Sequence, residues 1–258
     1  MTEGTATKGA IIITGASSGL GEEMARQFAA LGYDLGLAAR RTQRIDGLAD
    51  EIHAAHPTCR IETAALDVTD DDAVFAVFAD FAQRFGTIER VIVNAGLGKG
   101  APIGVGSHHA NRETAQTNFL GALAQAEAAM EIFRRQKRGH LVMISSMSAL
   151  RGMPKTMTVY AATKAGVASL AEGIRSEMLG KPDLKIDVSV IYPGYIRSEM
   201  NEKVSQKTKF MVDTETGVRA MVAAIEARKV KAYVPAKPWV AIAGAMKVLP
   251  LSMVRKLT

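Results

Sequence analysis

The chain has 258 residues, of which 48% are hydrophobic and 22% charged, a composition typical of a soluble globular protein and unlike that of a disordered or fibrous one. Its single cysteine, Cys59, excludes an intramolecular disulfide and a thiolate metal cluster, and we predict no metal site. The formal net charge of +6 raises the question of a nucleic-acid partner, but we expect none, because most basic residues are dispersed and the one dense run, RRQKRGH at 134–140, is predicted to be a solvated helix end.

The start of the chain gives an expectation about its location. The first nine residues, MTEGTATKG, are mostly polar, and the apolar run that follows at 10–13 is too short for the core of a signal peptide or for a membrane span. We therefore expect a cytoplasmic protein.

Apolar runs of strand length alternate with helical segments along the chain. Strands are expected at 10–14, 34–39, 60–66, 90–95, 140–146, 185–192 and 231–235, and helices at 19–31, 41–55, 70–85, 111–136, 158–179 and 214–228. Such strands, separated by helices, predict an α/β protein with a doubly wound, Rossmann-like fold, in which helices cover both faces of a parallel sheet of about seven strands. No linker or internal repeat divides the chain, so 1–258 is expected to form a single dinucleotide-binding and catalytic domain.

Two stretches interrupt this alternation. Residues 96–110 are rich in glycine, and residues 194–213 form a long polar insertion after the sixth strand. Ligands of open parallel sheets bind outside the carboxyl ends of the strands, so both stretches are expected to rim a site, with 195–213 as a substrate lid. The apolar C-terminal segment, 236–258, is open to three interpretations: a subunit contact, a wall of the substrate pocket or a peripheral membrane contact. Packing against its own protein is the default.

The octapeptide TGASSGLG at 14–21 follows the first strand and opens the first helix. Glycines at such a turn let the backbone approach a pyrophosphate, whose charge the helix N-terminus stabilises, so the position favours a nucleotide site over a plain structural turn. Arg40 and Arg41 follow the second strand, where a carboxylate would bind the ribose hydroxyls of NAD(H). Arginine accommodates a 2′-phosphate and favours NADP(H), although the two arginines could also simply begin a solvent-facing helix.

Polar residues of interest also follow the later strands. Asp67 is suited to accept a hydrogen bond from the adenine amine and also to begin a helix, while Asn94 in VNAG is interpreted as structural. Asn118 lies inside a predicted helix, where asparagine is unfavourable. Ser146 ends the fifth strand, and Tyr160 and Lys164 lie four residues apart on the following helix, so that they share one face.

From TGASSGLG to KAYVP, the sequence resembles the classical short-chain dehydrogenase/reductase family. The motifs that carry the resemblance are TGASSGLG, LDV, VNAG, the asparagine of TNFLG, ISS, YAATK and YPGYIRSEM, in that order. The resemblance implies catalytic roles for four residues: Tyr160 as general acid/base, Lys164 as the group that binds the nicotinamide ribose and lowers the pKa of the phenol, Ser146 as the holder of the substrate oxygen, and Asn118 as the anchor of a proton-relaying water.

The resemblance also implies a cofactor-binding set. Its members come from the glycine motif, the ends of strands two to four, the catalytic pair and the segment after strand six: Gly15, Ser17, Ser18, Gly19, Leu20, Gly21, Arg40, Arg41, Asp67, Val68, Asn94, Ala95, Gly96, Tyr160, Lys164, Pro193, Gly194, Ile196 and Ser198. Members of the family are commonly dimers or tetramers, which implies a homodimer or homotetramer through the helices at 111–136 and 158–179.

The sequence departs from the family pattern at two places. The serine commonly lies thirteen residues before the tyrosine, whereas Ser146 lies fourteen before Tyr160, with Ser145 at fifteen and Ser148 at twelve. We retain Ser146, because it ends the strand and the following loop can hold one extra residue. Ser17 stands where some NADP-specific members carry a basic residue, which leaves Arg40, together with Arg41, as the contact for a 2′-phosphate.

The sequence thus predicts an enzyme, an oxidoreductase that transfers a hydride between NADP(H), in preference to NAD(H), and a small-molecule carbonyl compound or secondary alcohol. The alternative is a catalytically silent nucleotide-sensing or regulatory binding protein. Such a protein would have no need for the serine, tyrosine and lysine that this chain carries together.

Overall fold

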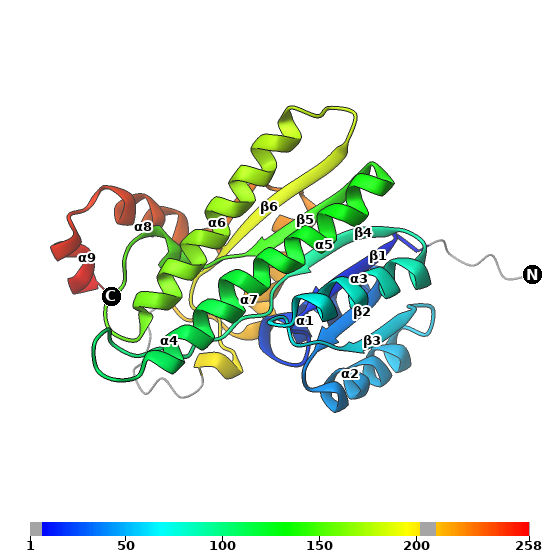
Figure 1. Cartoon of the computed structure of the whole chain (residues 1–258), viewed down its shortest axis with the longest axis horizontal. Helices are drawn as coiled ribbons and strands as arrows, with labels where there is room; N and C mark the ends of the chain where they lie inside the picture. The colour runs from blue at the N-terminus through cyan, green and yellow to red at the C-terminus, as the bar shows by residue number, and fades with distance from the viewer. Residues whose placement is uncertain (1–6, 202–209, 258) are drawn as a thin grey trace, which may run out of the picture.

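One parallel sheet organises the computed structural model, which describes residues 7–201 and 210–257 (Figure 1). Its seven strands lie in the order β3-β2-β1-β4-β5-β6-β7, and every neighbouring pair is parallel. Their bounds are β1 Ala10–Thr14, β2 Asp34–Ala39, β3 Ile61–Ala65, β4 Ile88–Val93, β5 Arg138–Ile144, β6 Lys185–Pro193 and β7 Lys231–Val234. The predicted parallel sheet is confirmed.

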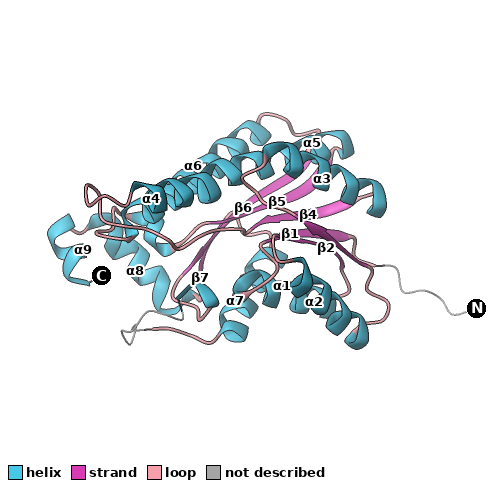
Figure 2. Ribbon diagram, turned by 60° about the horizontal axis from the view of Figure 1, so that its bottom comes forward, coloured by secondary structure: helices cyan, strands magenta, loops and turns pink. Residues whose placement is uncertain are grey.

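Helices cover both faces of the sheet (Figure 2). On one face lie α3 (Asp71–Phe85), α5 (Gly121–Gln136) and α6 (Met157–Leu179), and on the other α1 (Gly19–Ala30), α2 (Thr42–Ala55) and α7 (Thr214–Glu226). Buried side chains form one apolar core beneath each layer. Because strand side chains alternate, β1 contributes to both cores: Ile12 packs toward α3 and α5, and Ile11 and Ile13 toward α1 and α7. The doubly wound, Rossmann-like fold is therefore confirmed.

The helix expected at 111–136 is longer and is interrupted. It consists of α4 (His108–Ala115), a π-helical turn η1 (Gln116–Leu120) and α5. Just after the turn, the helix passes so close to the loop after β3 that a Cβ atom on Gly121 would lie 2.6 Å from the carbonyl oxygen of Val68. Single π-helical turns are rare and often occur at functional sites. This one contains Asn118.

Two local expectations were wrong. Asp67 does not begin α3, because the N-cap of that helix is Asp70, whose side chain accepts from the backbone N–H of Ala73 at 3.0 Å. Asp67 instead accepts two hydrogen bonds from Thr69 in the preceding turn. The basic run at 134–140 is not wholly a solvated helix end either, because β5 begins at its fifth residue and His140 is fully buried.

His140 belongs to a buried polar network at the amino ends of the central strands. Its Nδ1 accepts from Nε of Arg90 at 3.0 Å, and its Nε2 lies 2.7 Å from the hydroxyl of Ser189. Arg90 also pairs with Glu226 at 2.8 Å and stacks over the rings of Phe28 and Tyr33. A buried guanidinium is costly unless it is paired, and this network supplies its partners.

The apolar C-terminal segment forms two helices, α8 (Ala236–Val248) and α9 (Leu251–Leu257), beyond the edge of the sheet that ends in β7 (Figure 1). Trp239 is buried against Gly194, whereas Val248 is 80% exposed. Packing against the protein itself, the default interpretation, therefore holds for part of α8. Among the residues described, no helix is both long and apolar enough to cross a membrane.

Candidate active site

The glycine motif forms the turn between β1 and α1. Gly15 has a φ of +64°, which glycine adopts without strain, and a Cβ atom on Gly21 would lie only 2.4 Å from the carbonyl oxygen of Gly15. Ser18 is the N-cap of α1, but its side chain makes no capping hydrogen bond. The first turn of α1 therefore keeps N–H groups that its own cap does not satisfy, which fits the binding of a phosphate at this end.

Asn94 ties the end of β4 to the end of β1. Its Nδ2 donates to the carbonyl oxygen of Thr14 at 2.9 Å, and its backbone N–H donates to the hydroxyl of Thr14 at 3.1 Å. The same hydroxyl accepts from the N–H of Ala95 at 3.2 Å. These contacts agree with the structural interpretation of Asn94, and they hold the turn and VNAG together at the carboxyl edge of the sheet.

The two arginines after β2 point in different directions. Arg41 donates to the hydroxyls of Ser17 at 3.2 Å and Ser18 at 2.7 Å and so lies over the glycine turn. Arg40 is exposed, with its guanidinium 3.8 Å from the carboxylate of Asp67. The structure therefore brings Arg41 closest to the residues of the glycine turn and places Arg40 beside the residue expected near the adenine.

Two residues that the sequence analysis missed complete this region. The carboxylate of Glu199, in the short helical turn η3 (Glu199–Asn201), accepts two hydrogen bonds from Arg41, each at 2.9 Å, and lies 3.5 Å from Arg44. The hydrogen bonds from Arg41 and then Ser18 lower the pKa of Glu199 to about 2. Arg44 could have been found from its position three residues after Arg41, in the first turn of the helix whose N-cap is Arg41. No local pattern links Glu199 to either arginine.

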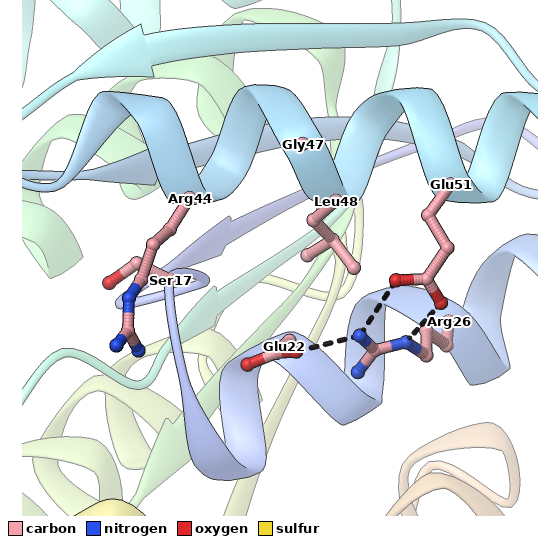
Figure 3. A pocket seen from close by; sticks show the side chains of 7 residues that line it. All are labelled: Ser17, Glu22, Arg26, Arg44, Gly47, Leu48 and Glu51. Carbon is pink, nitrogen blue, oxygen red and sulfur yellow. Dashed lines mark hydrogen bonds and ion pairs between the residues drawn. The ribbon is translucent and has the colours of Figure 1, made fainter.

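A cavity of about 290 Å³ lies between α1 and α2, next to the glycine turn (Figure 3). Ser17 and Arg44 line one end of it. At the other end Arg26 bridges Glu22 at 2.6 Å and Glu51 at 2.7 Å. The cavity therefore adjoins the cluster of Arg41, Arg44 and Glu199 on the side of α2.

The end of β5 meets the helix that carries the tyrosine and the lysine. Ser145 donates to the carbonyl oxygen of Lys164 at 2.8 Å, and Nζ of Lys164 donates to the carbonyl oxygen of Ile144 at 2.9 Å. The same Nζ lies 5.9 Å from the centre of the Tyr160 ring. Lys164 is only 5% exposed, and this burial lowers the pKa of its ammonium group to about 8.

Ser146 is the N-cap of the 3₁₀ turn η2 (Met147–Leu150). Its hydroxyl accepts from the N–H of Ser148 at 3.2 Å and from the hydroxyl of Ser148 at 3.0 Å. Burial raises the pKa of Tyr160, and a side-chain hydrogen bond with Ser146 opposes that rise. Burial outweighs the hydrogen bond, so the pKa of the phenol is raised. The resemblance to the family had implied a lowered pKa.

Asn118 holds the loop after β4 beside the lysine. It pairs with both backbone groups of Leu97, and its Nδ2 lies 3.5 Å from the hydroxyl of Thr163. A Cβ atom on Gly96 would lie 3.2 Å from Oδ1 of Asn118 and 3.5 Å from Nζ of Lys164. The asparagine, the lysine and VNAG thus converge at one point.

The segment after β6 approaches the glycine turn. Ser198 lies against Gly19, with 3.2 Å between the Cβ of the serine and the position that a Cβ of the glycine would take. Ile196 forms an isolated parallel bridge with Val212, and Gly194 contacts Trp239. Of the expected substrate lid at 195–213, residues 202–209 lie outside the part of the chain that the structure describes.

Comparisons with known proteins show which sequences and folds the chain is similar to. The family model described as short chain dehydrogenase matches residues 9–209. An uncharacterized oxidoreductase of Mycobacterium tuberculosis is 49% identical over 250 residues, which cover 97% of each chain.

Two solved structures share the fold. A short-chain dehydrogenase from Sphingobium yanoikuyae in complex with NADPH is 25% identical with a TM-score of 0.79, covering 95% of this chain and 97% of its own. A short chain dehydrogenase/reductase from Burkholderia phymatum in complex with NAD is 21% identical with a TM-score of 0.81, covering 94% and 92%. One contains NADPH and the other NAD, so they do not decide between the two cofactors.

Proposed function

The chain belongs to the short-chain dehydrogenase/reductase family, a family of oxidoreductases that bind a nicotinamide cofactor, and we propose that it transfers a hydride between NADP(H) and a carbonyl compound or secondary alcohol. The observation that carries this proposal is the convergence of Ser146, Tyr160, Lys164 and Asn118 at the carboxyl edge of the sheet, next to a glycine turn suited to a phosphate. When bound, the cofactor supplies or accepts the hydride.

Tyr160 acts as the general acid in the reductive direction and donates its phenolic proton to the substrate oxygen. Ser146 lies close enough to Tyr160 to oppose the rise in the pKa of the phenol, so we propose that its hydroxyl holds the same oxygen. General acid catalysis is most effective when the pKa of the acid lies near the working pH, whereas burial raises the pKa of this phenol. A further group must therefore favour the phenolate.

Lys164 is that group. Its ammonium ion lies 5.9 Å from the phenol ring, and a nearby positive charge favours an ionised phenolate. Asn118 lies close enough to the ammonium group to position a water between the two side chains. A Cβ atom on Gly96 would lie 3.2 Å from Oδ1 of Asn118 and 3.5 Å from Nζ of Lys164, so both side chains face the same point. Such a water would pass a proton from the lysine side toward the phenol.

The preference for NADP(H) rests on charge. Arg40, Arg41 and Arg44 lie around the end of β2 and the start of α2, together with the hydroxyls of Ser17 and Ser18. Guanidinium groups suit a phosphate because they offer several N–H donors in a fixed plane. Asp67, a carboxylate that the sequence analysis singled out, is already paired with Arg40 at 3.8 Å.

The Tyr160→Phe variant tests the catalytic proposal. A screen of ketones and secondary alcohols, followed by NADPH absorbance, first identifies a substrate. The variant should then lose about 10²-fold or more of its turnover and bind NADPH with nearly unchanged affinity, because only the hydroxyl is removed. Full activity in Tyr160→Phe would refute the assignment.

The Arg40→Asp variant tests the cofactor preference. It should invert or flatten the preference for NADPH over NADH, because it places a carboxylate where the ribose hydroxyls of NAD(H) would bind. Fluorescence titration of both nucleotides measures the ratio. Equal affinity of the wild-type protein for NADH and NADPH would contradict the proposal.

We also propose that two or four copies of the chain assemble through α5 and α6. Two leucines near the ends of the helical layer are largely exposed, Leu120 at 53% and Leu179 at 67%, and would gain from burial. Light scattering coupled to gel filtration would measure the mass in solution, and a Leu179→Glu variant should shift it toward the monomer.

A further inference from the structure

The carboxylate of Glu199 occupies an anion site that other parts of the chain build. Arg41 donates to its two oxygens at 2.9 Å each, and Arg44 lies 3.5 Å away. Arg44 projects from the first turn of α2 beside Ser17 (Figure 3). Ser18, which binds Arg41, also contributes a hydrogen bond to the carboxylate. Two guanidinium groups and the hydroxyl of Ser18 thus surround one negative group.

This carboxylate can leave the site. The side chains of Glu199, Arg41 and Arg44 are each close to half exposed, at 45%, 44% and 54%. Ion pairs exposed to this extent contribute about 1 kcal/mol or less, because water and salt screen them. A stronger anion that entered the site would therefore displace Glu199 at small cost.

The turn that carries Glu199 also contacts the loop after β4. Asn201 holds the turn by accepting from the N–H of Ser198 at 3.0 Å and donating to the carbonyl oxygen of Ile196 at 2.7 Å. Met200 packs against Gly98, where a Cβ atom would lie 2.7 Å from its Cγ. Gly98 follows Leu97, the residue that Asn118 holds, so η3 joins the anion site to the loop beside the catalytic residues.

We infer that Glu199 stands in for the cofactor's 2′-phosphate in the nucleotide-free protein and is a determinant of cofactor selectivity, because a 2′-phosphorylated nucleotide displaces it and an unphosphorylated one does not. This inference rests on the proposed function, since it assumes that a nicotinamide nucleotide binds along the glycine turn. It assigns roles to Glu199 and Arg44, neither of which follows from the glycine motif or from the arginines at the end of β2.

The selectivity follows from competition for the same donors. A phosphate monoester carries nearly two negative charges near neutral pH and three acceptor oxygens, whereas a carboxylate carries one charge and two oxygens. The phosphate can therefore replace the carboxylate of Glu199 as the partner of Arg41 and Arg44. The ribose hydroxyl of NADH is neutral and gains nothing from the arginines, so Glu199 stays paired with them. Discrimination of this kind uses an element that opposes the wrong ligand as well as contacts that favour the right one.

The test compares Glu199→Gln with Glu215→Gln, a control that removes a more exposed carboxylate, one paired with Arg219 on α7. Calorimetric titrations use NADPH, NADH and adenosine 2′,5′-bisphosphate. Glu199→Gln should bind NADPH and the bisphosphate about fivefold more tightly, since it loses a competing ion pair of about 1 kcal/mol, and should bind NADH as the wild type does. Arg44→Gln should bind NADPH more weakly, and Glu215→Gln should leave all three affinities unchanged.

Other outcomes overturn the inference. Unchanged NADPH affinity in Glu199→Gln, with NADPH still bound by the wild type, would show that the carboxylate does not compete with the phosphate. Weaker NADH binding in the same variant would make Glu199 a ligand of the ribose hydroxyls instead. Failure of the wild type to bind any of the nucleotides would count against the proposed function itself, and so would be distinguished from failure of the inference.

Discussion

The side chain of Asn118 pairs with both backbone groups of Leu97: its Oδ1 accepts from the N–H at 2.6 Å, and its Nδ2 donates to the carbonyl oxygen at 2.9 Å. Asn111 pairs in the same way with Ala101, at 3.0 and 3.1 Å. The two asparagines lie seven residues apart, about two helical turns, and fasten the loop after β4 along the helix. Only Asn118 also lies close to Lys164.

This pair of asparagines separates a structural role from a catalytic one. Asn118→Ala and Asn111→Ala each leave two backbone groups without their partner, and each should lower the free energy of unfolding by about 1–3 kcal/mol, measured by denaturant titration. Turnover should fall by about 10²-fold in Asn118→Ala alone, because only that change removes the anchor of a proton-relaying water. Equal loss of turnover in both variants would show that Asn118 acts only by holding the loop after β4 and has no catalytic role.

Replacement of Lys164 by Met should separate catalysis from stability. The ammonium group is buried, and a methionine of similar length removes the cost of burying a charge, so the thermal midpoint should stay the same or rise. Turnover should fall by about 10²-fold or more, because no cation then favours the phenolate of Tyr160. Calorimetry and steady-state rates measure the two effects. Activity close to that of the wild type would remove Lys164 from the mechanism.

The buried His140 should make stability fall at acidic pH. Burial and the nearby guanidinium groups of Arg90 and Arg228 lower its pKa to about 2, whereas the histidine of the unfolded chain takes up a proton near its ordinary value of about 6.5. Below that pH the unfolded state holds one more proton than the folded state. The free energy of unfolding therefore decreases as pH falls, by about 1.4 kcal/mol per unit from this residue alone.

The matched variants for this prediction are His140→Gln and His53→Gln, the second at an exposed position on α2. Urea titrations between pH 6 and pH 4 should give a shallower dependence on pH for His140→Gln and an unchanged one for His53→Gln. NMR of the wild type supplies an independent reading that does not depend on a variant folding: the His140 ring should show no titration down to pH 4. A midpoint near 6 would contradict the prediction.

Replacement of Gly21 by alanine should damage the nucleotide turn. Its Cβ atom would meet the carbonyl oxygen of Gly15 at 2.4 Å, and neither can rotate away, because the backbone fixes the position of both. We expect a loss of about 1–3 kcal/mol of stability and of measurable NADPH binding. Gly173→Ala, at a position on α6 where a Cβ meets nothing within 4 Å, should instead gain about 0.5–1 kcal/mol. Thermal unfolding of both variants and NADPH titration of Gly21→Ala decide the matter.

The sequence by itself determined the fold class and, up to β7, the positions of the strands and of most helices to within a few residues; the helices α8 and α9 were not predicted. Runs such as AIIIT and RVIVNA carry apolar residues at successive positions, which point to opposite faces of a strand. This local pattern indicates that both faces of the strand are covered. The spacing of Tyr160 and Lys164 likewise placed them on one face of a helix, since helical geometry depends only on neighbours in the chain. These features needed no knowledge of distant contacts.

The tertiary structure decided what depends on contacts between distant segments. His140 is the last residue of a basic run and was expected to be solvated, but β4 and β6 lie on either side of its strand and the side chain is fully buried. The direction of Arg41 is set by serines 23 and 24 positions away and by Glu199, 158 positions away. Long polar side chains have many rotamers of similar energy, and only the partners that folding brings near select one of them.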